Sequence, residues 1–111
     1  MAPSPKSPSL AHNVYFWMHR PDDTEEATAL ATGIKTLADV KYVRGFRLGR
    51  PASTAHREVV DGSFSYHLTL FFDSAEDQNA YQADPIHKRF VEACSGLWKK
   101  VVVYDSDTSL V

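Results

Sequence analysis

The amino-acid sequence predicts an α+β domain with the ferredoxin-like element order β-α-β-β-α-β, in which helices cover one face of a four-stranded antiparallel sheet. Three observations predict it. Apolar residues alternate with polar ones in several strand-length segments, and they recur at helical spacing in two others. The two kinds of segment follow one another in this order. The 111 residues are enough for one domain that needs no disulfide, and there is one cysteine.

The first strand and the first helix are marked by composition and by a break between them. Residues 12–19 (HNVYFWMH) are rich in β-branched and aromatic side chains, which are typical of a strand. Pro21 ends this strand. Residues 22–38 repeat apolar side chains at helical spacing, and either Asp23 or Thr24 is the expected N-cap.

The middle of the chain predicts two strands joined by a long loop. Residues 41–49 have strand character, and residues 63–72 alternate strictly between apolar and polar positions. The polar loop over residues 50–62 ends in an Asp-Gly pair, which is typical of a turn. Two apolar residues inside it, Val59 and Val60, are unusual for a solvated loop.

The loop therefore has two interpretations. Residues 57–61 either fold as an arm against a partner subunit, with Arg57 and Asp61 in ion pairs, or form an ordinary surface hairpin.

The second helical segment is broken near its middle. Residues 74–83 begin with Ser74 as N-cap. Asp84 then caps a new helix that starts with Pro85, because proline is tolerated at the first helical position. Residues 98–104 close the domain as a valine-rich strand.

Composition and charge predict the organisation of the chain, the class of partner and the location. We expect a disordered lead over residues 1–10, a domain over 11–107 and a short tail over 108–111. A formal charge of −2 argues against a nucleic-acid partner. No apolar run approaches the ~20 residues of a membrane span, and no secretory signal is evident, so we expect a cytoplasmic protein.

Alternation along the strands gives the sheet a second face that is rich in aromatic rings. A solvated face normally has polar residues at these positions. We expect either a sheet-to-sheet homodimer or an aromatic but solvated face. The residues expected at the dimer interface are Tyr15, Trp17, His19, His67, Phe71, Val102 and Tyr104.

Three segments carry a resemblance to a known family: HNVYFWMH (12–19), YQADPIHKRF (81–90) and LWKKVVVYDSD (97–107). Together they resemble the stress-responsive α/β-barrel (Dabb) domain family of the dimeric α/β-barrel superfamily. The loop PASTAHREVVDGSF (51–64) is similar to a bacterial branch of that family. The resemblance implies that the sheet packs face to face against its twin, forming a dimeric α/β barrel. It also implies a homodimeric protein linked to stress responses.

The sheet face toward the helices is expected to carry a pocket. Pockets for small molecules are mostly apolar, with a few convergent polar groups. We expect this one to bind a small apolar or aromatic ligand. Its expected lining residues are His12, Val14, Phe16, Tyr66, Leu68, Leu70 and Phe90.

Catalysis is the alternative to simple binding. A plant polyketide cyclase in the family uses a tyrosine and a histidine of the broken helix, and by resemblance these are Tyr81 and His87. His87 is then the general base, Tyr81 donates a hydrogen bond to an enolate, and no cofactor is needed. The cyclase has a histidine where Asp84 stands and another where Tyr66 stands, so a cyclase or lyase and a non-enzymatic binding protein both fit.

Other site chemistries find less support in the sequence. The five histidines show no paired spacing for a zinc site, so no metal is expected. Cys94 lies on an apolar helical stripe, where a buried thiol acts as a small hydrophobic side chain. A monooxygenase of the same superfamily is a third candidate, although no arrangement of haem ligands is visible.

Overall fold

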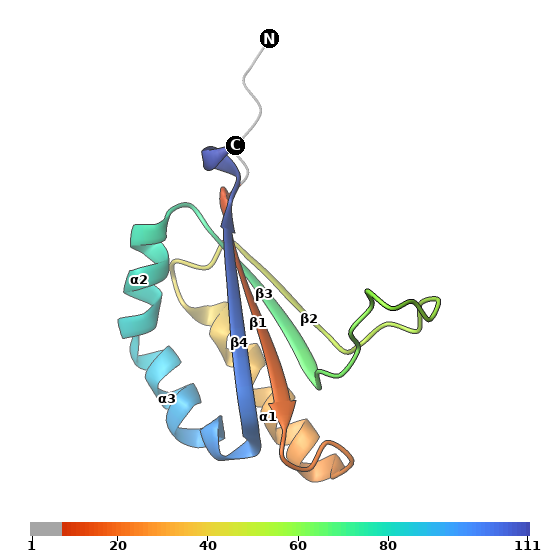
Figure 1. The fold of residues 1–111 in the computed structure, drawn as a ribbon. Coiled ribbons are helices and arrows are strands. Elements are labelled where there is room, and N and C mark those ends of the chain that lie inside the picture. Colours follow the sequence, from red (N-terminus) through yellow and green to blue (C-terminus); the bar gives the residue numbers. More distant parts are fainter. Residues whose placement is uncertain (1–7) are drawn as a thin grey trace.

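A computed structural model describes residues 8–111 of the chain. It contains β1 (Leu10–Met18), α1 (Thr24–Thr36), β2 (Gly45–Gly49), β3 (Tyr66–Phe72), α2 (Ala75–Ala83), α3 (Pro85–Cys94) and β4 (Trp98–Asp107) (Figure 1). Short 3₁₀ helices occupy Leu37–Asp39, Ser95–Leu97 and Thr108–Leu110. None of the helices in this part of the chain is long and apolar enough to cross a membrane.

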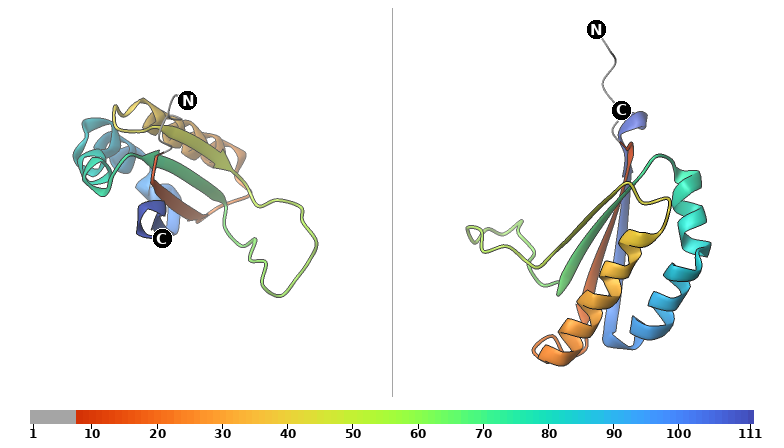
Figure 2. Two further views of the ribbon diagram at one scale, coloured as in Figure 1. Left: turned by 90° about the horizontal axis from the view of Figure 1, so that it is seen from above. Right: turned by 180° about the vertical axis from the view of Figure 1, so that it is seen from behind.

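The four strands form one antiparallel sheet in the order β2-β3-β1-β4. All the long helices lie on one side of this sheet (Figures 1 and 2). We call this side the helix face and the opposite side the outer face. The architecture confirms the predicted α+β, ferredoxin-like fold, with the second helical segment in two pieces.

Strand alternation decides which side chains reach the core. In β1 every second residue is buried, from Leu10 to Met18. Leu70 and Phe72 of β3 pack with Leu30 and Ile34 of α1, and none of these four side chains is accessible to solvent. Burying one such side chain contributes ~1.5–3 kcal/mol, so the helix face is the main source of stability.

Helix α1 is capped as predicted and packs closely on α3. The Asp23 carboxylate accepts a hydrogen bond from the backbone N–H of Glu26 at 3.0 Å, which makes Asp23 the N-cap. At Gly33 a Cβ atom would lie 2.4 Å from Sγ of Cys94. Glycine therefore permits this helix–helix approach, and Cys94 is buried as expected.

The junction between α2 and α3 also confirms the prediction. Ser74 caps α2 through the N–H of Asp77 at 3.1 Å, and Asp84 caps α3 through the N–H of Ile86 at 2.9 Å. Pro85 occupies the first turn of α3, where its missing N–H is not needed. The helical segment therefore changes direction between Ala83 and Pro85.

The strand boundaries differ from the predicted ones. β2 is shorter than expected because Val40–Val43 form a turn, in which the N–H of Val43 donates to the carbonyl of Val40 at 3.0 Å. β4 continues to Asp107, three residues beyond the expected end, because it pairs with β1 as far as Leu10. Leu10 was expected in a disordered lead and is buried in β1 instead.

The two ends of the described chain are in contact. The N–H of Thr108 donates to the carbonyl of Ser9 at 2.8 Å, and a 3₁₀ helix over Thr108–Leu110 follows in the segment that was expected to be a short tail. The rest of the expected lead, residues 1–7, lies outside the described residues.

Candidate functional site

The helix face contains a cavity of about 170 Å³ between the sheet and α3. Its mouth lies beside three valines, Val91, Val101 and Val103, which are 37–46% exposed. The wall is mostly apolar. Five of the seven residues expected to line a pocket here do so: His12, Val14, Phe16, Leu68 and Phe90.

Two of the expected lining residues do not reach this cavity. Leu70 is completely buried in the core. The Tyr66 hydroxyl donates to the backbone carbonyl of Ala27 at 3.0 Å and accepts from the Arg50 guanidinium at 2.8 Å. The side chain is therefore held beneath α1, and Tyr66 lines a different depression at the foot of the sheet.

The break between α2 and α3 brings Tyr81 and His87 together. Tyr81 lies in the last turn of α2, and His87 lies in the first turn of α3. Their ring centroids are 4.8 Å apart at an angle of 68°. Because the chain turns at Asp84 and Pro85, both side chains line the same cavity.

A third ring and a carboxylate complete the polar end of the cavity. His12 of β1 lies 5.9 Å from the Tyr81 ring, measured between centroids. Its Nδ1 is 2.5 Å from Oδ1 of Asp105, its cross-strand partner on β4. Because a carboxylate only accepts hydrogen bonds, the proton lies on Nδ1, and the pair fixes the orientation of the imidazole.

Burial shapes the protonation of two of these groups. The pKa of His87 is lowered mainly by burial and further by nearby His12, while Asp84 opposes the shift. The pKa of Tyr81 is raised by burial. At neutral pH His87 is therefore an uncharged imidazole that can accept a proton, and Tyr81 is a phenol that can donate a hydrogen bond.

The Tyr81 hydroxyl is available to a ligand. The ring is only 2% exposed and lines the cavity, and none of the side-chain hydrogen bonds found among residues 8–111 uses its hydroxyl. A ligand oxygen in the cavity could accept this bond. Over the same residues, no three His, Cys, Asp or Glu side chains come together as metal ligands.

Sequence reasoning missed Asp105 as a member of this site. The predicted last strand stopped at Tyr104, one residue short. On a longer strand, the alternation that places Val101 and Val103 on the helix face places Asp105 there as well, beside His12. The two-residue period of the strand was therefore the signal that could have identified Asp105.

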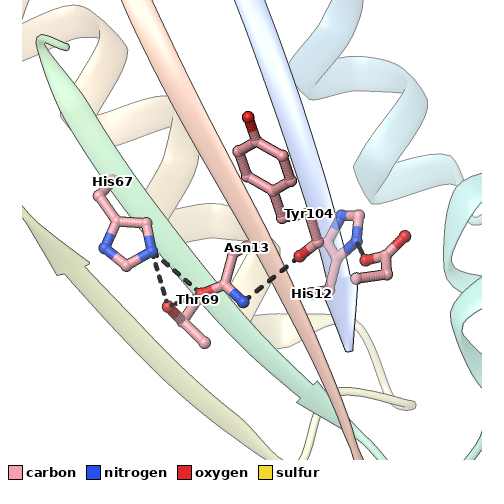
Figure 3. Close-up of polar contacts among 6 residues, drawn as sticks. His12, Asn13, His67, Thr69 and Tyr104 are labelled. Atoms are coloured by element: carbon pink, nitrogen blue, oxygen red, sulfur yellow. Dashed lines mark hydrogen bonds and ion pairs between the residues drawn. The ribbon is translucent and has the colours of Figure 1, made fainter. Parts of the chain in front are cut away.

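The outer face carries a polar network among aromatic rings (Figure 3). The Asn13 side-chain oxygen accepts from Thr69 at 2.8 Å and lies 3.1 Å from Nε2 of His67. His67 stacks on Tyr15, with ring centroids 4.4 Å apart. Burial, with the nearby Arg47 charge, lowers the pKa of His67. The face is therefore mixed rather than uniformly apolar.

Most residues expected at a dimer interface lie on this outer face. Tyr15, Trp17, His67, Phe71 and Val102 are half-buried there, and Tyr104 is 65% exposed. His19 is an exception: β1 ends at Met18, so His19 lies beyond the sheet and strand alternation does not assign it to either face.

Comparison with protein families gives one match. Residues 10–108 match the model of Dabb, described as a stress responsive A/B barrel domain. The comparison with curated proteins found no match.

Solved structures share the fold at low sequence identity. A Dabb family protein with a ferredoxin-like fold from Mesorhizobium loti is 18% identical, with a TM-score of 0.71 over 89% of this chain and 95% of that one. A dimeric ferredoxin-like protein from Thermobifida fusca is 14% identical, with a TM-score of 0.71 over 92% of both chains. A hydroxynitrile lyase from Passiflora edulis is 16% identical, with a TM-score of 0.74 over 91% and 94%.

Proposed function

Because the chain belongs to the Dabb family, we propose that it is a homodimeric protein that binds a small apolar or aromatic ligand in the helix-face cavity. The observation that carries this proposal is the cavity, with apolar walls and three titratable side chains at one end. The proposal includes a role in a stress response, which the family description supports. It also includes a cytoplasmic location, where the free Cys94 thiol would stay reduced.

The size and polarity of the cavity support one class of ligand. Apolar cavities of ~150 Å³ hold molecules of the size of benzene. The volume of about 170 Å³ therefore suits a single aromatic ring. The Tyr81 hydroxyl supplies one hydrogen bond at the polar end, so a ring that carries a carbonyl group fits best.

The homodimer is supported by the outer face and by the relatives. Large exposed apolar patches on a soluble protein usually mark an interface. Here half-buried aromatic rings extend across the face from Trp17 to Phe71. The similar protein from Thermobifida fusca is described as dimeric.

A second candidate, a cofactorless cyclase or lyase, is favoured by the position of Tyr81 between two imidazoles. His87 takes a proton from the carbon next to a carbonyl: the C–H bond breaks, an N–H bond forms and the electron pair moves onto the carbonyl oxygen. Tyr81 donates a hydrogen bond to that oxygen as negative charge develops. Asp105 holds His12 in orientation beside Tyr81. A hydroxynitrile lyase is among the proteins with this fold.

Two matched probes test the binding proposal. We expect acetophenone to raise the melting temperature, because a ligand that binds only the native state stabilises it. Tyr81→Phe should weaken acetophenone binding by about 2- to 10-fold, the equivalent of one hydrogen bond, and leave ethylbenzene binding unchanged. Tyr104→Phe on the outer face is the matched control. If neither probe binds wild-type protein, the proposed ligand class is wrong.

Exchange of the acetophenone methyl protons in D₂O tests the catalytic candidate separately. An enzyme with His87 as base should accelerate this exchange, and His87→Gln should abolish the acceleration while the protein still binds the ketone. Binding without accelerated exchange in wild-type protein would exclude the enzyme and leave the binding protein.

A further inference from the structure

The segment between β2 and β3, residues 50–65, forms an arm, and we propose that this arm docks onto a second copy of the chain. The inference rests on the proposed homodimer and deepens it, because it assigns part of the contact to residues outside the sheet. Four features of the arm carry it: its exposed valines, its direction, its fixed base and its unpaired charges.

The outer part of the arm has no core of its own. Every residue from 52 to 63 is exposed, and the valine side chains at the tip, Val59 and Val60, are 78% and 45% exposed. The backbone at the tip forms a turn, in which the N–H of Val60 donates to the carbonyl of Arg57 at 3.0 Å. Two adjacent exposed valines on one turn gain free energy when another surface covers them.

The arm projects from the protomer on the side away from α2 and α3. Figure 1 shows it leaving the foot of β2 and β3 opposite these helices, and both views of Figure 2 agree. It therefore extends beyond the outer face. A second sheet packed on that face would lie next to the arm.

The base of the arm is fixed and continuous with the outer face. Ser63 accepts a hydrogen bond from the Trp17 indole at 3.0 Å, and the N–H of Ser65 donates to the carbonyl of Phe16 at 2.7 Å. The Phe64 ring lies 5.1 Å from Tyr15 and 6.3 Å from His67, between centroids. The arm and the outer-face rings thus form one surface.

The charges of the arm suit a symmetric contact. Arg57 and Glu58 are exposed, and neither belongs to the three ion pairs found among residues 8–111. In a twofold contact each subunit offers the same surface, so a patch carrying both signs can pair with its own copy. Continuity with the outer face and this self-complementarity identify the occupant as a second copy.

Sedimentation equilibrium of three forms of the protein tests the inference. We expect wild-type protein to dimerise, and Val59→Asp/Val60→Asp to raise the dimer dissociation constant by about tenfold or more, because the two aspartates would bring negative charge into the contact. The control Thr28→Asp/Ala29→Asp adds the same two charges to exposed positions on α1. It should leave the dissociation constant unchanged.

A shortened arm provides a second variant that does not depend on added charge. A Cβ at Gly62 would lie 3.5 Å from Cβ of Pro51, so the two sides of the arm meet at its base. Residues 52–61 can therefore be replaced by Asn-Gly, a turn that suits a tight hairpin. Circular dichroism should show an intact fold, and the dimer should weaken as in the valine variant.

The outcomes separate the arm from the homodimer. A wild-type dimer whose dissociation constant is unaffected by both arm variants overturns the arm contact and leaves the homodimer standing. A wild-type protein that stays monomeric at all concentrations overturns both. A photo-crosslinking residue at position 59 should yield a covalent dimer, and its failure to do so in a dimeric sample also overturns the arm contact.

Discussion

The two faces of the sheet use the same strands for different purposes. On the helix face, alternate residues of β1 and β3 are buried under α1 and α3, and a cavity with His12, Tyr81 and His87 lies beside this core. On the outer face, the intervening residues are half-buried rings around the Asn13–His67–Thr69 network. The helix face contains most of the core and the candidate site, and the outer face is a half-buried aromatic and polar surface.

The difference shows how a two-residue period places neighbouring residues of one strand in two different environments. His12 and Asn13 are neighbours in β1, yet His12 lines the cavity on the helix face. Asn13 belongs to the polar network of the outer face (Figure 3). A change at one position can therefore affect binding without affecting the outer surface. Five experiments test the different roles of the two faces.

The largest difference should come from two adjacent phenylalanines. Phe72→Ala removes a completely buried ring on the helix face and should lower the free energy of unfolding by ~3–5 kcal/mol. Phe71→Ala acts on the outer face and should cost about 1 kcal/mol in the monomer. Urea denaturation at low protein concentration measures both. Equal losses would show that the outer face contributes as much stability as the helix face.

Two glycines provide the next comparison. Gly33→Ala places a Cβ 2.4 Å from Sγ of buried Cys94, and overpacking should cost ~1–3 kcal/mol although alanine favours a helix. Gly45→Ala places a Cβ 2.9 Å from the Phe71 ring, which can turn away on the open outer face, so the cost should be smaller.

Cys94→Ala should restore part of the stability of Gly33→Ala in a double-mutant cycle. The expected coupling is at least ~0.5 kcal/mol, because the two substitutions share one contact. Additive losses would contradict the close packing of α1 on α3.

The caps of α2 and α3 test whether the break between these helices positions Tyr81 and His87. Ser74→Ala and Asp84→Ala each remove a side-chain cap and should each cost about 1 kcal/mol in thermal or urea unfolding. Asp84→Ala should also weaken acetophenone binding, since it loosens the junction that brings Tyr81 and His87 together. Ser74→Ala is the control; if it weakens binding equally, the break does not position the site.

The smallest effect is a pH dependence that both faces share. Burial lowers the pKa of His87 and of His67 from 6.5, so the unfolded chain binds more protons below that pH. Their contribution to stability is therefore fully present above pH 6.5 and is lost as the pH falls through the folded pKa values. His87→Gln and His67→Gln should each flatten this loss in denaturation curves at pH 7.5 and 5.5. Stability that rises on acidification would contradict both shifts.

Much of the fold could be predicted because the local signals agree with the tertiary structure. Asp23, Ser74, Asp84 and Pro85 mark the helix starts, and each is found where its chemistry suggests. The predicted ends of the strands were less accurate where hydrogen bonding to a neighbouring strand determines them. The last strand continues to Asp107 because β1 offers hydrogen-bonding partners that far, and a partner strand is invisible in a local pattern.

The site could be predicted only in part, for a related reason. Tyr81 and His87 are close in sequence, and the proline between them indicated a turn. Tyr66 has the correct strand phase for the cavity, but its hydroxyl bonds to Ala27 and Arg50 instead. These two hydrogen bonds depend on the positions of α1 and of Arg50 in space. Strand alternation predicts which face a side chain is on, but it carries no information about those positions.

The pairing of the first strand with the last has a consequence for synthesis. His12 and Asp105 are 93 residues apart, and Val101 and Val103 complete the cavity wall from the same final strand. A chain emerging from the ribosome therefore carries its imidazole long before the carboxylate that orients it exists. Contacts between such distant residues form late and slowly. Ligand binding should consequently appear only once translation has passed Asp105, and a truncated product without β4 should have none.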